Sequence, residues 1–232
     1  MTEPVSTEST LDLYDPEYFA GLPVDSDRIQ QIMGHLQFAA EDQVCEFGSG
    51  LGHILFAIHE KIAFGLGVDF AEYAILESQR SAQASGIENL HFECVDVTLL
   101  PERGENHERF DKVLMMDVTE HIDDDLMRDF IGSAGQILKP GGELIIHTPN
   151  AGYLIERLKH QGVFLKQLPG HIAVRGEQHY RKLLRDGGFE VSRMIYLPHY
   201  RSPIRQLDKA LMLIPWLGRL FRSRLLITAT KA

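Results

Sequence analysis

The chain has 232 residues, of which 44% are hydrophobic and 24% charged, and its formal net charge is −10. This composition is typical of a globular domain and excludes a collagen, a coiled coil and a disordered chain. No apolar run reaches the roughly 18 residues of a membrane-spanning helix, and the acidic amino-terminal segment resembles neither a signal peptide nor a transit peptide. We therefore expect a cytoplasmic protein with a flexible leader over 1–10 and a single domain over 11–232.

The charge is unevenly distributed. Residues 201–232 contain seven Lys or Arg and one acid, a net charge of +6, so residues 1–200 carry −16. An acidic body argues against a nucleic-acid partner, because neutralisation of phosphates supplies most non-specific affinity for nucleic acid. Cys45 and Cys94 are too few for a disulfide framework, and both lie in apolar runs, so we expect two buried free thiols.

Helical and strand patterns alternate along the chain. In chain order they predict a helix over 25–36, a strand over 43–50, a helix over 53–62, a strand over 63–70, a helix over 71–86, strands over 90–97 and 110–118, a helix over 123–138, a strand over 143–150, a helix over 177–188, and strands over 189–197 and 225–231.

This alternation implies right-handed crossovers and a parallel sheet. The last two strands break the rhythm, because a long connection with its own helical segment joins them. The predicted fold is a Rossmann-like α/β domain, with a seven-stranded, mostly parallel sheet, an antiparallel last strand at one edge and helices on both faces.

The first strand ends in a glycine-rich turn, Glu46-Phe47-Gly48-Ser49-Gly50-Leu51-Gly52. Glycines let the backbone turn tightly and approach a ligand, and ligands of open α/β sheets bind at the carboxyl ends of strands. The third glycine of the dinucleotide pattern G-x-G-x-x-G would fall at His53, which argues against an NAD-dependent oxidoreductase. Glu46 suits an ammonium group better than a pyrophosphate.

Two more carboxylates end the next two strands. Asp69 lies about 20 residues beyond the glycines, where a carboxylate can accept two ribose hydroxyls. Asp96 could accept a hydrogen bond from an amino group such as that of adenine. A solvated strand end is the alternative for each acid alone, but three acids at three successive strand ends favour a ligand site.

These segments resemble the ordered motifs of the class I S-adenosylmethionine-dependent methyltransferases. The motifs are E-F-G-S-G-L-G, G-V-D, C-V-D-V, F-D-K-V-L-M-M-D and L-K-P-G-G-E-L, over about residues 40–150. The resemblance implies that S-adenosylmethionine is the cofactor. It assigns the methionine portion to Glu46, Gly48, Ser49, Gly50 and Gly52, the ribose to Asp69, the adenine to Phe70, Asp96 and the backbone of Val97, and a further contact to Asp117.

The stretch after the fourth strand carries the candidate chemistry. Asp117 and Glu120 are three residues apart, so a helical turn would place them on one face beside His121. With His171 they could bind a divalent cation. Two alternatives stay open: His121 is a metal-free general base, or the acids only mark a helix start. We interpret His147, inside the fifth strand, as a core histidine.

A second resemblance concerns this stretch. D-x-x-E-H, T-P-N and a later D-G-G-F are similar to the ubiquinone-biosynthesis O-methyltransferases and to the small-RNA 3′-terminal 2′-O-methyltransferases. Both groups carry E-x-x-E-H and are associated with a divalent metal, whereas the first position here is Asp117. The resemblance implies a divalent metal at Asp117, Glu120 and His121. Together with His171, this ligand set suits Mg²⁺, Mn²⁺ or Zn²⁺, and we expect His121 and His171 to be the catalytic residues.

The remaining segments predict the acceptor side. We expect 151–176 and 198–224 to form acceptor-side or lid elements, and Tyr14 and Tyr18 to close over the cofactor or to dock on the sheet. The basic, apolar segment 207–221 fits either a peripheral contact with a membrane or lipid-linked substrate, or a lid packed on the protein's own core.

The predicted function is methyl transfer to a hydroxyl of a small-molecule acceptor, such as a lipid-linked, polyketide or sugar hydroxyl. The alternatives are an RNA 2′-O-methyltransferase, which the acidic body disfavours, and a non-catalytic relative that only binds the cofactor. A homodimer is expected on base rates alone.

Overall fold

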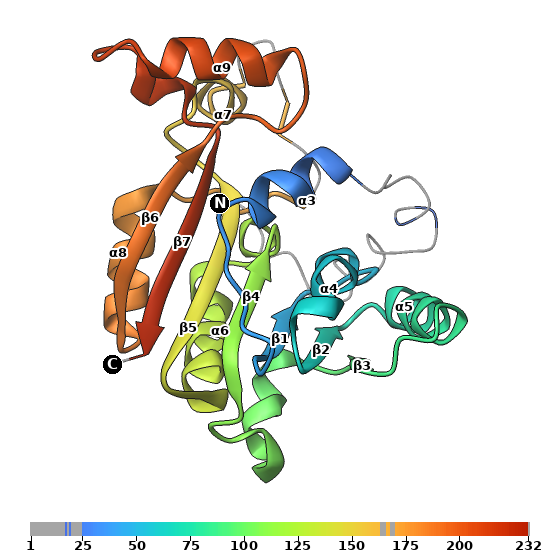
Figure 1. Cartoon of the computed structure of the whole chain (residues 1–232). Helices are drawn as coiled ribbons and strands as arrows, with labels where there is room; N and C mark the ends of the chain where they lie inside the picture. Colours follow the sequence, from blue (N-terminus) through green and yellow to red (C-terminus); the bar gives the residue numbers. More distant parts are fainter. Residues whose placement is uncertain (1–16, 18, 20–24, 163–165, 168–169, 232) are drawn as a thin grey trace.

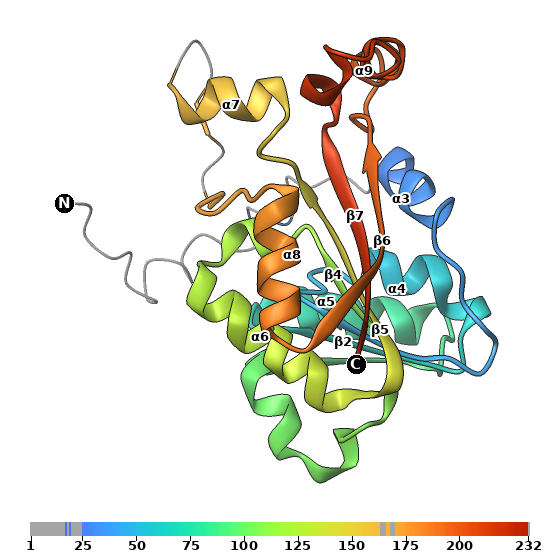
Figure 2. The same cartoon turned by 90° about the vertical axis from the view of Figure 1, so that its left-hand side faces the viewer.

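The computed structural model describes residues 17, 19, 25–162, 166–167 and 170–231. In this part of the chain, a seven-stranded sheet with strand order β3-β2-β1-β4-β5-β7-β6 has helices on both faces (Figures 1 and 2). This confirms the predicted fold class. The predicted leader over 1–10 and the predicted lid residues Tyr14 and Tyr18 lie outside the described residues.

The elements follow the predicted order. The strands are β1 (Gln43–Phe47), β2 (Phe64–Asp69), β3 (Leu90–Cys94), β4 (Phe110–Met116), β5 (Leu138–Pro149), β6 (Phe189–Leu197) and β7 (Arg224–Lys231). The α-helices are α3 (Ser26–Met33), α4 (His53–Ile58), α5 (Glu72–Ala84), α6 (Asp124–Ile137), α7 (Leu154–His160), α8 (Glu177–Asp186) and α9 (Ile204–Met212). Short 3-10 turns are η1 (His59–Lys61), η2 (Val97–Glu102), η3 (Gly104–Asn106), η4 (Thr119–His121) and η5 (Gly218–Phe221).

The antiparallel strand is not at the edge of the sheet, which corrects that part of the prediction. β7 pairs antiparallel with both β5 and β6, so it lies between them and β6 is the edge strand. The burial of the two strands explains this order. β7 buries a run from Leu225 to Ile227, as an interior strand does, whereas residues 190–196 of β6 are half-buried or exposed.

The fifth strand begins five residues earlier than predicted. The Lys-Pro-Gly-Gly sequence was expected to break the chain before residue 143, but β5 begins at Leu138, which pairs with Phe110. A register shift follows in β4 between Phe110 and Lys112, and Gly141 has a positive φ of 74°. The Lys-Pro-Gly-Gly segment therefore forms a bulge within the β4–β5 pair and does not end the strand.

The core has two layers, one on each face of the sheet. One layer packs the sheet against α6 and α8 through residues such as Phe130, Ile131 and Leu184. The other packs it against α3, α4 and α5 through residues such as Ile32 and Leu55. Because each fully buried large side chain contributes roughly 1.5–3 kcal/mol, the two layers hold the strand ends in fixed positions.

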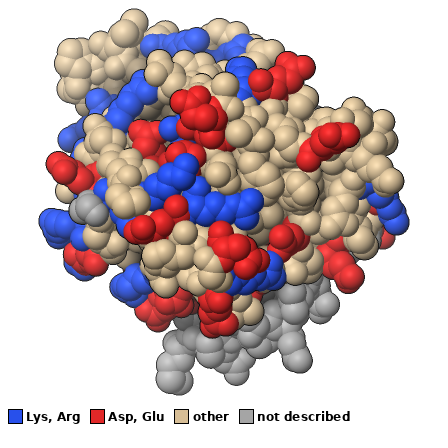
Figure 3. All heavy atoms as spheres, turned by 60° about the horizontal axis from the view of Figure 1, so that its bottom comes forward, with Lys and Arg blue, Asp and Glu red and all other residues tan. Residues whose placement is uncertain are grey.

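The described residues of the two segments predicted as acceptor-side elements lie at the carboxyl ends of the parallel strands. Figures 1 and 2 show α7 and α9 projecting beyond this edge, with α3 beside it. The opposite edge has interspersed acidic and basic side chains, as Figure 3 shows. No described helix combines the length and the apolar character that crossing a membrane requires.

One cysteine prediction is wrong. Cys45 is fully buried in β1, as expected, but Cys94 is exposed. Cys94 is the last residue of β3, the edge strand beyond β2, where neighbouring strands cover one side only. Neither thiol forms a disulfide.

Candidate functional site

The glycine-rich turn, which connects β1 to α4, has three residues in the left-handed conformation. Gly48, Gly50 and Gly52 have positive φ angles of 68°, 50° and 72°. A Cβ on Gly48 would lie 2.5 Å from Cγ2 of Val118, and one on Gly52 would lie 2.5 Å from Cε1 of Phe92. Glycine is therefore required both by conformation and by the close approach of neighbouring side chains.

Glu46 is a buried carboxylate without a complete set of partners. Its residue is 2% exposed, and its Oε2 atom has no hydrogen-bond partner among the described residues. Burial, reinforced by the charge of Asp69 and opposed by Arg28, raises the pKa of Glu46 to about 8. The buried hydroxyl of Ser49 also lacks a partner. Because buried polar atoms are normally paired, both atoms fit a ligand with hydrogen-bond donors.

Asp69 connects the second strand to the glycine-rich turn. Its Oδ2 accepts a hydrogen bond of 2.8 Å from the Gly50 N–H, and its Oδ1 accepts one of 2.9 Å from the Ala71 N–H. Burial raises the pKa of Asp69. Each carboxylate oxygen retains a second lone pair, so the arrangement leaves acceptors for the ribose hydroxyls that the sequence predicts.

The residues predicted around the adenine lie at the neighbouring strand ends. Phe70 follows β2 and is 47% exposed. Asp96 is exposed, and its Oδ1 accepts hydrogen bonds from the backbone N–H and the hydroxyl of Thr98, at 2.9 and 2.8 Å. Asp96 is thus the N-cap of η2, which begins at the buried Val97. The sequence interpretation did not include this structural role.

Asp117 lies in a cluster of cationic and imidazole groups. Its carboxylate forms ion pairs with Arg28 of α3 and with Arg224 of β7, the second at 2.8 Å, and its Oδ1 lies 3.1 Å from Nδ1 of His147 without the alignment of a hydrogen bond. Burial opposes ionisation, but His147, Arg224 and Arg28 together hold the pKa of Asp117 well below its usual range. In this structure the predicted fourth metal ligand is therefore occupied by protein cations.

Arg28 is a site residue that the sequence interpretation missed. It contacts Asp117, and its positive charge lowers the pKa of the buried Glu46. One signal could have found it, since Arg28 is the only Lys or Arg among the first 60 residues.

Glu120, His121 and His171 converge as the sequence predicts. Each offers one ligand atom, and these atoms all lie within 4.8 Å of one another. The two imidazole rings meet edge to face, with centroids 4.9 Å apart. Burial lowers the pKa of His121, and burial with the charge of His121 lowers the pKa of His171 to about 4, so both rings are neutral at pH 7. Burial, and then Asp117, raises the pKa of Glu120 to about 8.

Arg175 holds this triad together and was also missed. Its guanidinium donates hydrogen bonds to the backbone oxygens of Thr119 and Ile122, at 2.5 and 2.8 Å. The Ala173 N–H donates a hydrogen bond of 3.1 Å to the backbone oxygen of Glu120. These bonds fix the loop around His171 against η4.

The helix-start alternative does not account for Glu120. The N-cap of α6 is Asp123, whose Oδ1 accepts hydrogen bonds from the N–H groups of Asp125 and Leu126. Glu120 instead is fully buried in η4, and its Oε2 accepts a long hydrogen bond of 3.4 Å from the Thr148 hydroxyl. A buried acid beside two histidines suits metal binding or proton transfer better than helix capping.

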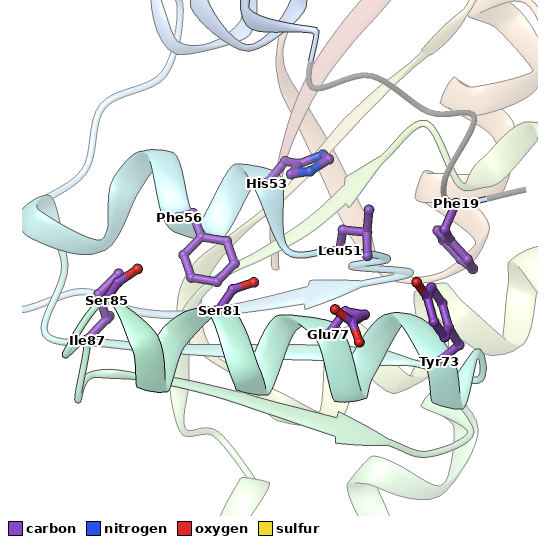
Figure 4. Close-up of a pocket in the computed structure, with 9 residues that line it drawn as sticks. All are labelled: Phe19, Leu51, His53, Phe56, Tyr73, Glu77, Ser81, Ser85 and Ile87. Atoms are coloured by element: carbon purple, nitrogen blue, oxygen red, sulfur yellow. The ribbon is translucent and has the colours of Figure 1, made fainter. Parts of the chain in front are cut away.

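A groove of about 570 Å³ lies between α4 and α5, behind the glycine-rich turn (Figure 4). Figure 4 shows Phe19 beside Tyr73 at one end and Phe56 toward the other. Phe19 is buried against Leu51 and Ala71. The groove shares no residue with the triad, so it is a separate feature that borders the predicted cofactor site.

Comparison with known proteins identifies the family of the chain. Residues 39–188 match a family model described as a methyltransferase domain. A ubiquinone biosynthesis O-methyltransferase from Leptothrix cholodnii is 28% identical over 166 residues, covering 70% of this chain and 65% of that protein. A tRNA U34 carboxymethyltransferase from Pseudoalteromonas atlantica is 27% identical over 139 residues, covering 57% of this chain and 41% of that protein. The matches therefore span less than two thirds of either relative.

A solved structure shows the same fold. Geranyl diphosphate C-methyltransferase from Streptomyces coelicolor, in complex with Mg²⁺, geranyl diphosphate and S-adenosyl-L-homocysteine, superposes with a TM-score of 0.64 at 16% identity. The superposition covers 99% of this chain and 90% of that one. At this identity the match establishes the shared fold alone.

Proposed function

We propose that this chain, which belongs to the S-adenosylmethionine-dependent methyltransferases, transfers a methyl group to a hydroxyl oxygen of a small-molecule acceptor. The observation that carries the cofactor part of the proposal is the buried, incompletely paired Glu46 carboxylate, beside a turn in which Gly48 and Gly52 leave no room for a Cβ. The cofactor supplies an electrophilic methyl group on a sulfonium, and the residues described below bind it and prepare the acceptor.

The chain offers complementary groups for each part of the cofactor. An amino-acid moiety carries an ammonium and a carboxylate. Glu46 fits the ammonium, because its buried oxygen lacks a partner, and Arg28 fits the carboxylate, because its guanidinium lies near Glu46. Asp69 would bind the ribose, and Phe70, Asp96 and the backbone of Val97 would border the adenine. Gly48, Ser49, Gly50 and Gly52 let the backbone approach.

His121 is the proposed general base. Its lowered pKa keeps the imidazole neutral at pH 7, so one ring nitrogen can accept the proton of the attacking hydroxyl. His171 has a lower pKa of about 4, which makes it the weaker base of the two. We assign His171 to orienting His121 and the acceptor oxygen, and Arg175 to holding the loop in place.

The triad also fits a divalent cation. Glu120, His121 and His171 together offer one carboxylate and two neutral imidazoles, a set that suits Mg²⁺, Mn²⁺ or Zn²⁺. A metal there would lower the pKa of an acceptor hydroxyl by Lewis-acid polarisation. Asp117 is left out of this set because its carboxylate is engaged by Arg28 and Arg224.

We favour a small-molecule acceptor over RNA, because residues 1–200 carry a charge of −16. The predicted acceptor-side segments, 151–176 and 198–224, include α7 and α9. The α9 region has an exposed apolar surface, with Leu207, Leu213 and Trp216 exposed by 57%, 83% and 75%. These three side chains do not pack on the core, which favours a peripheral lipid contact and a lipid-linked acceptor.

The proposal is tested by separating cofactor binding from methyl transfer. We would incubate the chain with S-adenosylmethionine and a panel of phenolic, lipid-linked, sugar and tRNA acceptors, and measure S-adenosylhomocysteine release. On any active acceptor, His121→Ala should lower the rate about a hundredfold or more while S-adenosylhomocysteine still binds. The matched control is His107→Ala, an exposed histidine in the η3 region. Equal rates for the two variants would remove His121 from the mechanism, and activity on tRNA alone would overturn the small-molecule acceptor.

A further inference from the structure

A second groove, of about 670 Å³, shares no lining residue with the α4–α5 groove. Residues at the end of β5, in α7, at the start of α8 and in η5 line it. Figure 2 shows α7 and the α9 region on either side above the first turn of α8. The groove contains none of the residues assigned above to the cofactor or the triad.

Three arginines from separate elements line this groove. Arg157 belongs to α7, Arg219 to η5, and Arg222 follows η5. Within the described part of the chain, none of the three forms an ion pair with a carboxylate, although most other arginines do. The guanidinium carbon of Arg222 lies 4.3 Å from the centre of the Tyr196 ring, a cation–π contact.

The acidic residue in the lining, Glu177, already has hydrogen-bond partners within the protein. Glu177 accepts a hydrogen bond of 2.9 Å from Arg181 and another from the Tyr196 hydroxyl. These bonds hold the pKa of Glu177 below its usual value, with Arg222 contributing through its charge. His179 is paired with Asp124 at 2.8 Å. The groove therefore keeps an excess of positive charge, in a protein whose body is acidic.

The first turn of α8 adds neutral donors to the three arginines. Gly176 is the N-cap and provides no side-chain cap. Among the described residues, no acceptor receives the N–H groups of Glu177 or Gln178. Unpaired N–H groups at a helix start favour an anion, so these donors support what the arginines already indicate.

We propose that this groove binds a phosphate group. Arginine presents planar pairs of donors that match phosphate oxygens and remains charged at any physiological pH. Three guanidiniums around one groove carry enough positive charge to neutralise the two negative charges of a phosphate monoester or the single negative charge of a phosphate diester. A groove of this volume also has room for an organic group attached to the phosphate.

Two sources of phosphate fit the position. His171 and Gly176 are five residues apart, so the groove begins within about 18 Å of the triad, and a soluble phosphorylated ligand could bind beside it. The exposed Trp216 precedes Arg219 by three residues, so the headgroup of an anionic lipid could bind there while the apolar side chains enter the lipid.

The test measures binding and does not depend on methyl transfer. We would titrate the full chain with sn-glycerol 3-phosphate at low ionic strength, using glycerol as the uncharged comparison. Sedimentation would measure binding to phosphatidylcholine vesicles with and without phosphatidylglycerol. The variant is R157Q/R219Q, which removes two exposed arginines from the groove. The matched control is R80Q/R185Q, which removes two arginines that are 71% and 76% exposed elsewhere.

We expect R157Q/R219Q to weaken binding of the phosphate probe at least about tenfold, while R80Q/R185Q stays within about twofold. Binding of glycerol phosphate that survives Trp216→Ala identifies a soluble ligand. Binding of phosphatidylglycerol vesicles alone, weakened by Trp216→Ala as well, identifies a lipid headgroup. The proposal is overturned if neither probe binds better than its uncharged comparison, or if both double variants lose binding equally.

Discussion

Arg224, the first residue of β7, donates a hydrogen bond of 2.8 Å to Oδ1 of Asp117, which follows β4. Asp117 has a positive φ of 56°, and Arg28 contacts its other oxygen. The antiparallel strand β7 and helix α3 are thus joined to the end of the parallel strand β4 through one carboxylate. Because η4 follows two residues later, this cluster sets the position of Glu120 and His121.

We predict that Asp117→Asn lowers the free energy of unfolding by roughly 3 kcal/mol, because two partly buried guanidiniums lose their counter-charge. Because asparagine tolerates the left-handed backbone, the loss of stability comes from the missing charge and not from backbone strain. Urea unfolding measures it. The control Asp125→Asn removes a 93% exposed carboxylate and should change stability by less than about 0.5 kcal/mol. Equal effects of the two variants would contradict the role given to Asp117.

The raised pKa of Glu46 predicts that the free energy of unfolding depends on pH. The folded chain holds the Glu46 proton more tightly than the unfolded chain, with a pKa of about 8 against 4.5. The resulting stabilisation is fully present below about pH 4.5 and is lost as the pH rises through about 8. The Glu46→Gln variant lacks this titration. Without ligand, the free energy of unfolding of the variant minus that of the parent chain should therefore rise by about 3 kcal/mol from pH 4.5 to pH 7.

The same variant should bind S-adenosylhomocysteine at least about tenfold more weakly, because a neutral amide replaces the partner of an ammonium group. Unfolding at several pH values and calorimetric titration measure the two effects. A Glu46→Gln variant that gains no stability with pH, or that binds S-adenosylhomocysteine as tightly as the parent chain, would contradict this role for Glu46.

Much of the fold could be predicted from the sequence, because hydrophobic periodicity and the positions of glycines determine where strands, helices and turns form. The seven strands and the main helices lie near their predicted ranges, and the family resemblance is confirmed. The place of β7 was missed because strand order depends on tertiary pairing. The convergence of Glu120, His121 and His171 was predicted, whereas Arg28 and Arg224 were missed, because cations 89 and 107 residues from Asp117 leave no local pattern.

Gly48 and Gly86 provide a matched pair of substitutions. Both have positive φ, 68° and 66°, but a Cβ would collide with Val118 only at Gly48, whereas nothing lies within 4 Å at Gly86. Gly86→Ala should therefore cost about 1 kcal/mol through backbone strain alone and leave ligand binding intact. Gly48→Ala should cost more and weaken S-adenosylhomocysteine binding at least about tenfold. Comparable binding by the two variants would show that the turn does not approach the cofactor.

Metal binding at the triad predicts a thermal effect that does not require activity. If Glu120, His121 and His171 bind a cation, Mn²⁺ or Zn²⁺ added to chelator-treated protein should raise the melting temperature by mass action. His171→Ala should abolish this rise, and His107→Ala should retain it. A rise of the same size in both variants would place the metal elsewhere, and no rise in the parent chain would leave His121 as a metal-free base.

The central claim is that the turn after β1 and the acids at the strand ends bind S-adenosylmethionine. Isothermal titration of the intact chain with S-adenosylhomocysteine tests it most directly, with NAD⁺ and adenosine as comparison ligands. We expect one site per chain, micromolar or tighter, with much weaker binding of NAD⁺ and adenosine, because neither carries the amino-acid moiety that Glu46 and Arg28 would bind. Absence of S-adenosylhomocysteine binding up to about 1 mM, or equal affinity for NAD⁺, would contradict the account.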